Sequence, residues 1–156
     1  MKSDGRLSLV LHALLHMGDL DAAITSEDLA ARMAIHPVVM RRTMAGLREA
    51  GIVRAQKGRG GGWEVARPLD EIRLDEVYAA LGVTTLFAVG PRTKNPRCLV
   101  ERAVNRAVDE ALAHASDVFL AGLKRTSLAD VRREVTHARP ASCRSQRSSR
   151  GEQRHA

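Results

Sequence analysis

The stretch Pro37-Val-Val-Met-Arg-Arg-Thr-Met-Ala-Gly-Leu-Arg-Glu-Ala-Gly51 decides the fold that we expect for this chain. Proline suits the first position of a helix, and glycine suits the left-handed position just after its end. Between them, apolar residues recur at helical spacing and predict a buried stripe: Met40, Met44 and Leu47. Arg41 and Arg42 fall outside that stripe. The segment is therefore predicted to be an amphipathic helix with a basic exposed side.

Two shorter helical patterns precede this segment. The first runs from Leu7 to about Gly18, with apolar residues at i, i+3, i+4, i+7 and i+8. The second ends near Ala34, and either Thr25 or Ser26 is suited to cap its start. Two short helices, a tight turn and a basic third helix predict a helix-turn-helix that enters the major groove of DNA.

A β-hairpin is predicted directly after the third helix. Its strands are Ile52 to Gln56 and Trp63 to Ala66, joined by the glycine-rich tip Lys57-Gly-Arg-Gly-Gly-Gly62. Two cations on such a tip suit contacts to the DNA backbone or the minor groove, which makes the hairpin a wing. We expect Trp63 to pack this wing against the third helix rather than to stack on a base.

Specific side chains are expected to contact DNA. An arginine of the third helix can bind guanine O6 and N7, and Val38 can touch a thymine methyl group. An ordinary solvated basic face remains the alternative for Arg41 and Arg42. The predicted DNA-binding residues are Thr25, Ser26, Pro37, Val38, Arg41, Arg42, Lys57 and Arg59.

A long helix is predicted from Cys98 to Leu123, and it carries two apolar stripes. One stripe contains Val100, Val104, Ala107, Ala111 and Val118. The other contains Val108, Leu112, Ala115, Phe119 and Leu123. One stripe is enough to dock a helix on its own domain, so the second suggests a homodimer formed through residues 98–123.

The chain is thus expected to be mainly α with a small β-hairpin wing, a winged helix-turn-helix followed by a long dimerisation helix. Residues 1–82 form the predicted DNA-binding domain, and residues 83–97 form a loop. Residues 98–136 hold the dimerisation helix and a final short helix, which Ser127 can cap. Residues 137–156 are predicted to be a disordered basic tail.

The composition agrees with a nucleic-acid partner but does not require one. The 156 residues carry a net charge of +7, and the pI is about 10.4. Residues 138–156 hold five arginines and one acid, which accounts for +4 of that charge. Two cysteines fit a reducing cytoplasm, and no apolar run is long enough to suggest a membrane span or a signal peptide.

Several of these segments together resemble the Rrf-type winged-helix regulators. They are Leu47 to Val53, Lys57 to Trp63, Ala66-Arg-Pro68, Arg6-Leu-Ser-Leu9 and Ser127-Leu-Ala-Asp130, and the resemblance covers about residues 5 to 135. It implies a bacterial repressor or activator that is dimeric through the long helix and binds a near-palindromic operator. It also implies that Arg41 and Arg42 read bases and that Lys57 enters the minor groove.

The chain differs from the cluster-binding members of that family at the residues that bind their iron–sulfur cluster. Those members carry three cysteines before the long helix, whereas only Cys98, in Arg97-Cys98-Leu99, is present here. One thiolate does not hold an iron–sulfur cluster, so we predict no cluster and no other cofactor. Cys98 is then either a redox-sensing thiol or a small residue without that role.

We therefore expect a sequence-specific regulator, more readily a repressor. A thiol-based redox regulator that uses Cys98 and a winged-helix protein–protein module remain alternatives, although two arginines disfavour the latter. A small-molecule effector between the winged domain and the long helix is also conceivable. His12 and His16 have zinc-compatible spacing but no third ligand nearby, and no catalytic triad or carboxylate pair suggests an enzyme.

Overall fold

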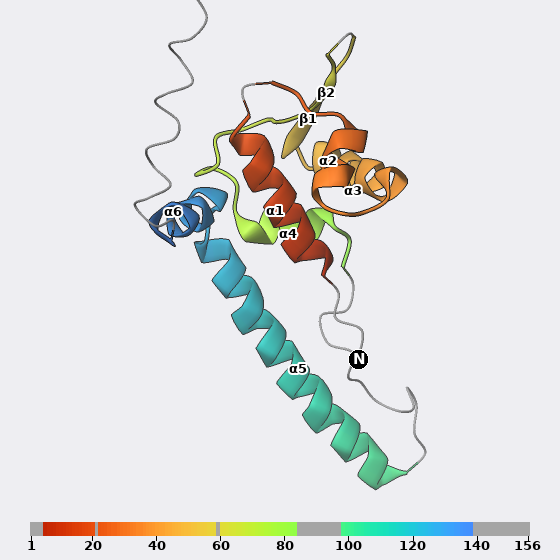
Figure 1. Ribbon diagram of the computed structural model, residues 1–156. Coiled ribbons are helices and arrows are strands. Elements are labelled where there is room, and N and C mark those ends of the chain that lie inside the picture. Colours follow the sequence, from red (N-terminus) through yellow and green to blue (C-terminus); the bar gives the residue numbers. More distant parts are fainter. Residues whose placement is uncertain (1–4, 21, 59, 84–97, 139–156) are drawn as a thin grey trace, which may run out of the picture.

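The computed structural model describes residues 5–20, 22–58, 60–83 and 98–138. Helices dominate it, and a single antiparallel hairpin follows the third helix (Figure 1). The predicted fold class, mainly α with a small hairpin wing, is confirmed. In chain order the elements are α1 (Arg6–Gly18), α2 (Ser26–Arg32), α3 (Pro37–Glu49), β1 (Val53–Gln56), β2 (Gly62–Val65), α4 (Leu74–Ala80), α5 (Leu99–Arg125) and α6 (Leu128–Ala138).

The core lies where the first four helices and the hairpin meet. The predicted stripe of α3 is buried there, with Met40, Met44 and Leu47 at most 1% exposed. The other fully buried side chains are mostly aliphatic and come from several elements: Val10, Leu14, Leu29, Ile52, Ile72 and Val77. Such a core needs no large aromatic residues, because close packing of branched side chains fills the space.

The helix ends follow the local signals. Thr25 rather than Ser26 caps α2, since its hydroxyl accepts a hydrogen bond from the Asp28 N–H. Pro37 begins α3, and Gly51 adopts the predicted left-handed conformation with φ of 69°. Helix α2 ends at Arg32, two residues earlier than predicted, and Ala34 in the following turn also has a positive φ.

The hairpin is tied to the chain segment before α2. Ile24 and Trp63 exchange main-chain hydrogen bonds of 2.9 and 2.8 Å, so a short bridge joins this segment to β2. A Cβ atom on Gly62 would lie 2.4 Å from the Ile24 carbonyl oxygen. Only glycine permits this approach, which fixes the base of the wing beside the start of α2.

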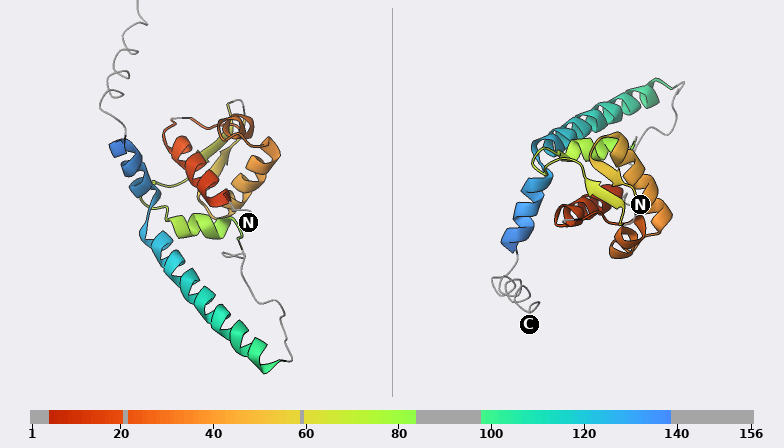
Figure 2. Two further views of the ribbon diagram at one scale, coloured as in Figure 1. Left: turned by 60° about the horizontal axis from the view of Figure 1, so that its bottom comes forward. Right: turned by 90° about the horizontal axis from the view of Figure 1, so that it is seen from above.

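Helix α5 differs from the others because none of its residues is buried. Its 27 residues span about 40 Å. Figure 1 and Figure 2 show its first part extending away from the body, while its C-terminal part lies beside α4. There the rings of Phe119 and Tyr78 meet edge to face at 5.6 Å. No helix among the described residues combines the length and apolarity needed to cross a membrane.

After α5 the chain returns to the winged helix. Leu128 is fully buried, and its N–H donates to the Ile72 carbonyl at 3.0 Å. Ser127 caps α6 as predicted, because its hydroxyl accepts from the Asp130 N–H at 3.1 Å. Arg132 then pairs with Asp19 at the end of α1. The two ends of the described chain, α1 and α6, therefore pack together.

The final helix is longer than the short one that we expected. It continues through Ala138, so residues 137 and 138 belong to α6 and not to the predicted tail. The remainder of that tail, residues 139–156, lies outside the described residues, as does most of the predicted loop at 83–97. The division of the chain into domains stays a prediction.

Candidate nucleic-acid interface

The side of α3 opposite its buried stripe is open to solvent. Val38 is 44% exposed, Arg41 and Arg42 are exposed, and Ala45 is half-buried between them. Pro37, at the first helical position, is also half-buried. The predicted face therefore exists as an accessible surface that combines two cations with small and apolar side chains.

The two arginines on this face have different surroundings. A nitrogen of the Arg41 guanidinium, Nη2, lies 2.7 Å from the Glu27 carboxylate oxygen Oε1 on α2. Both side chains of that pair stay about 60% exposed, so Arg41 is held but not buried. Arg42 makes no ion pair or side-chain hydrogen bond with any described residue. Neither arginine is withdrawn into the body of the protein.

Thr25 and Ser26 stand at the start of α2, but their hydroxyl groups have internal partners. Thr25 donates to the Asp28 carboxylate at 2.8 Å as well as capping the helix. Ser26 is only 7% exposed, and its hydroxyl accepts a hydrogen bond of 2.9 Å from the Trp63 indole. A contact from Ser26 to a phosphate would have to use its main-chain N–H, one of the groups that a helix leaves unpaired at its first turn.

Trp63 forms hydrogen bonds with α2 and with the segment before it. Its indole N–H reaches Ser26 on α2, and its main chain pairs with Ile24. The wing is therefore anchored to the start of α2 by both main chain and side chain. The predicted packing of Trp63 against α3 stays a prediction.

The wing presents one described cation at its tip. Lys57 is exposed just after β1, whereas the predicted contact residue Arg59 lies outside the described residues. On the strands, Arg54 and Glu64 are cross-strand partners, and their side chains meet at 2.7 Å. The hydrogen bond to Glu64 raises the pKa of Arg54. Arg54 is thus engaged on the hairpin, whereas Lys57 is positioned at its end.

Sequence reasoning missed three residues of this region. Arg48 is exposed and lies seven residues after Arg41, so two helical turns place both on one side of α3. His36 caps α3, with its Nδ1 accepting from the Val38 N–H at 3.2 Å. Glu27 is the third. The spacing of Arg48 was visible in the sequence, but the pairing of Glu27 with Arg41 was not.

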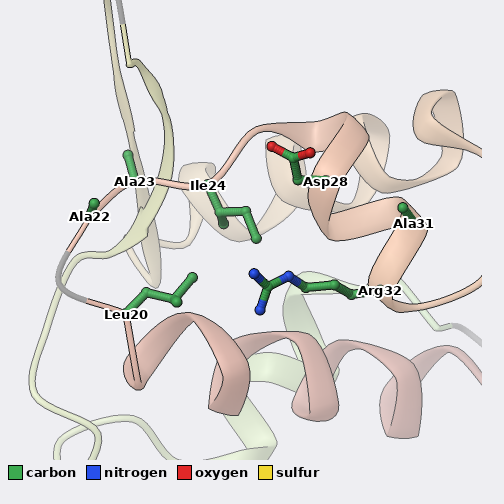
Figure 3. A pocket seen from close by; sticks show the side chains of 7 residues that line it. All are labelled: Leu20, Ala22, Ala23, Ile24, Asp28, Ala31 and Arg32. Carbon is green, nitrogen blue, oxygen red and sulfur yellow. The ribbon is translucent and has the colours of Figure 1, made fainter. Parts of the chain in front are cut away.

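A depression next to this region is lined by residues of α2 and of the segment before it: Leu20, Ala22, Ala23, Ile24, Asp28, Ala31 and Arg32. Figure 3 shows the Arg32 guanidinium pointing into it, toward Leu20 and Ile24. The depression is open to solvent, and the residues that line it do not include any from the long helix. The effector site that we expected between the winged domain and the long helix stays a prediction.

The fold and the site together define a class. Three helices, a projecting hairpin anchored beside them, and a third helix with an exposed basic side make up a winged helix-turn-helix DNA-binding protein.

The particular family follows from comparison with known proteins. The model of the Rrf2 family, described as "Iron-dependent Transcriptional regulator", matches residues 4–134. The chain belongs to the Rrf2 family of transcriptional regulators, which is not a family of enzymes.

A related protein agrees with this assignment, and solved structures agree with the fold. YwnA of Bacillus subtilis, which bears the name of an HTH-type transcriptional regulator, is 33% identical over 129 residues, covering 82% of this chain and 95% of YwnA. The structure of T. potens IscR has a TM-score of 0.61 at 19% identity and covers 90% of this chain and 93% of its own. A transcriptional regulator from Lactobacillus plantarum has a TM-score of 0.73 at 18% identity, covering 87% and 93%.

The family description mentions iron, but the residues present here do not fit an iron–sulfur cluster. Such clusters are normally held by four ligands, mostly cysteines. The segment 83–97 contains no cysteine, histidine, aspartate or glutamate. No group of three or more of these residue types is close enough to hold a metal within the described residues. His12 and His16 approach to 3.0 Å between their Nε2 atoms, but they are only two.

Cys98 is exposed and occupies the position that caps α5. The second cysteine, Cys143, lies outside the described residues. A redox role for Cys98 stays a prediction, and unchanged DNA affinity after oxidant treatment would exclude it.

Proposed function

We propose that this chain is a homodimeric repressor that binds a near-palindromic operator by placing α3 in the major groove. The observation that carries the proposal is the division of α3 into two sides. One side is buried through Met40, Met44 and Leu47, and the other exposes Arg41 and Arg42. The buried side gives the helix a fixed position on the body, so the basic side can meet a groove as a rigid surface.

The groove-facing residues have distinct proposed roles. Arg41 and Arg42 are the candidates for bidentate contact to guanine, and Val38 for contact to a thymine methyl group. The main-chain N–H groups of Thr25 and Ser26 lie at the start of α2, where the helix dipole favours phosphate. Pro37 begins α3 and has no N–H to donate, so it would contribute only surface contact. Lys57, and by position Arg59, would contact the backbone or minor groove from the wing.

The proposed homodimer rests on the unequal covering of α5. Phe119 and Leu123, from one predicted stripe, pack toward α4 and the core. The other stripe remains open, with Val100 71%, Val104 55% and Val118 60% exposed. Aliphatic residues in a row at helical spacing gain free energy when another protein surface covers them. A second copy of the same helix would do so with two-fold symmetry, and a two-fold dimer matches a palindromic site.

Repression is the simplest regulatory outcome of this arrangement. A dimer that occupies promoter DNA blocks the polymerase without any further contact surface, whereas activation requires one. We place the protein in the cytoplasm, where bacterial DNA is found and where its two cysteines would stay reduced.

The test is a gel-shift assay at two salt concentrations, which measures binding to the DNA upstream of the chain's own gene. We expect operator binding at submicromolar concentration or tighter, with a log-log salt slope that reports several phosphate contacts. Light scattering after gel filtration should give the mass of two chains. If the chain binds operator and scrambled duplexes equally, the proposal is wrong and the interaction-module alternative gains weight.

A further inference from the structure

We propose that Glu27 is a positioning residue for base recognition: its carboxylate orients the Arg41 guanidinium toward the groove. The inference rests on the proposed function of α3 as the reading helix, and it adds a residue of α2 to the elements that set sequence specificity. Glu27 itself would not touch a base.

The backbone that carries the Glu27 carboxylate is held in position by hydrogen bonds of its neighbours. On one side of Glu27, the hydroxyl of Ser26 is buried and bonded to the Trp63 indole. On the other side, the main chain and carboxylate of Asp28 are both bonded to Thr25. These contacts immobilise the first turn of α2, so the backbone of Glu27 is held although its side chain is exposed.

The contact itself constrains Arg41 in a useful way. Only the Nη2 nitrogen of Arg41 is engaged, at 2.7 Å from the Glu27 oxygen Oε1. A guanidinium has five N–H donors in one plane, so the remaining donors stay free to form the paired hydrogen bonds that guanine accepts. Arg42, one residue further, has no such partner among the described residues and must lose its side-chain freedom on binding.

Stability of the isolated protein does not explain the pair. Exposed ion pairs contribute little to folding, and both members here are about 60% exposed. When DNA excludes water from this surface, the same pair becomes stronger and restricts the orientation of the guanidinium. Orientation in the bound state is therefore the larger consequence of the contact.

The negative charge of Glu27 also has a direct effect on DNA. A carboxylate at the start of α2 repels phosphates in every complex, specific or not. The favourable effect of Glu27 on binding, which acts through Arg41, arises only where a guanine is in place. Glu27 should therefore lower affinity for unrelated duplexes and raise the ratio between operator and unrelated duplexes.

The experiment uses full-length protein, the duplex that wild type selects from a random library, and a scrambled duplex of equal length. Fluorescence anisotropy gives both dissociation constants for Glu27→Gln, Arg41→Ala and the double variant. The matched control is Glu134→Gln, which makes the same charge change on the exposed side of α6. Thermal unfolding of each variant tests whether an effect comes from the fold.

We expect Glu27→Gln to bind the scrambled duplex about twofold more tightly and to lose about two- to fivefold in the operator-to-scrambled ratio. Its unfolding temperature should stay within a degree or two of wild type. The loss of ratio should vanish in the Arg41→Ala background, because no guanidinium remains to be oriented. Glu134→Gln should leave the ratio unchanged.

Two failures are distinguishable. If wild type selects no preferred duplex, the proposed function has failed and the present inference falls with it. The second failure requires that wild type does select a preferred duplex. If Glu27→Gln then keeps the full operator-to-scrambled ratio, or lowers that ratio equally in the wild-type and Arg41→Ala backgrounds, only the proposed role of Glu27 is refuted.

Discussion

Helices α3 and α5 are both amphipathic, but they differ in what they leave exposed. Helix α3 buries Met44 and Leu47 completely and exposes arginines. Helix α5 is twice as long, buries no residue, and exposes valines. A basic exposed side suits a polyanion, whereas an aliphatic exposed side suits another protein surface. The contrast supports the proposal that α3 contacts DNA and that α5 contacts a second subunit.

The largest expected effect comes from the buried side of α3. Leu47→Ala should lower the free energy of unfolding by about 2–5 kcal/mol, because it removes packed methyl groups and leaves a cavity. Urea denaturation followed by circular dichroism measures this. Val39→Ala, on an exposed position of the same helix, should change stability by less than about 0.5 kcal/mol. Equal losses in the two variants would mean that α3 is not anchored by its methionine and leucine stripe.

The next effect concerns the exposed stripe of α5. Val104→Glu should weaken the proposed dimer by about 2 kcal/mol or more for each carboxylate that the interface buries. Sedimentation velocity measures the dissociation constant, and circular dichroism should show the helix content of wild type. Ala113→Glu adds the same charge at an exposed position outside both apolar stripes and serves as the control. If the Val104→Glu protein remains dimeric at the same concentration, the exposed stripe of α5 is not part of the dimer interface.

A smaller effect distinguishes the role of the basic side of α3 in DNA binding from the role of the wing. Arg42→Ala should cost about 1–3 kcal/mol of operator binding and relax sequence preference, because it removes base contacts. Lys57→Ala should weaken operator and scrambled duplexes more evenly and reduce the salt slope by about one. Parallel titrations at two salt concentrations compare them. The assignment of roles fails if the two variants show the same pattern.

The same two helices show what the sequence was able to predict. The ends of α3 followed from Pro37 and Gly51, and its buried stripe followed from spacing, because both are local signals. The two stripes of α5 also followed from spacing, and their unequal exposure agrees with the expected second surface. The existence and type of the elements were predictable because their periodicity is strong.

What the sequence did not reveal depends on contacts between distant positions. Glu27 and Arg41 are 14 residues apart, and Ser26 and Trp63 are 37 apart. No local pattern specifies either pairing. The length of α6 was missed for a related reason. Beyond Val131 its only large apolar residue is Val135, which is exposed, and the pairing of Arg132 with Asp19 at the end of α1 joins it to the body.

The smallest expected effect tests how firmly the chain after α5 is tied to the body. The Asp130 carboxylate accepts hydrogen bonds from the main chain and hydroxyl of Ser127, and these hold the pKa of Asp130 at about 2, below its ordinary 3.8. A lowered pKa in the folded state stabilises the protein above the ordinary pKa, and this contribution disappears as the pH falls from about 4 to 2. Wild type should therefore exceed Asp130→Asn in urea midpoint at pH 7, and the difference should shrink as the pH falls below about 4 and vanish only below about 2. Asp117→Asn on the exposed side of α5 should show no such difference. A pH-independent gap between wild type and Asp130→Asn would mean that the Ser127 contacts do not depend on the charge of Asp130.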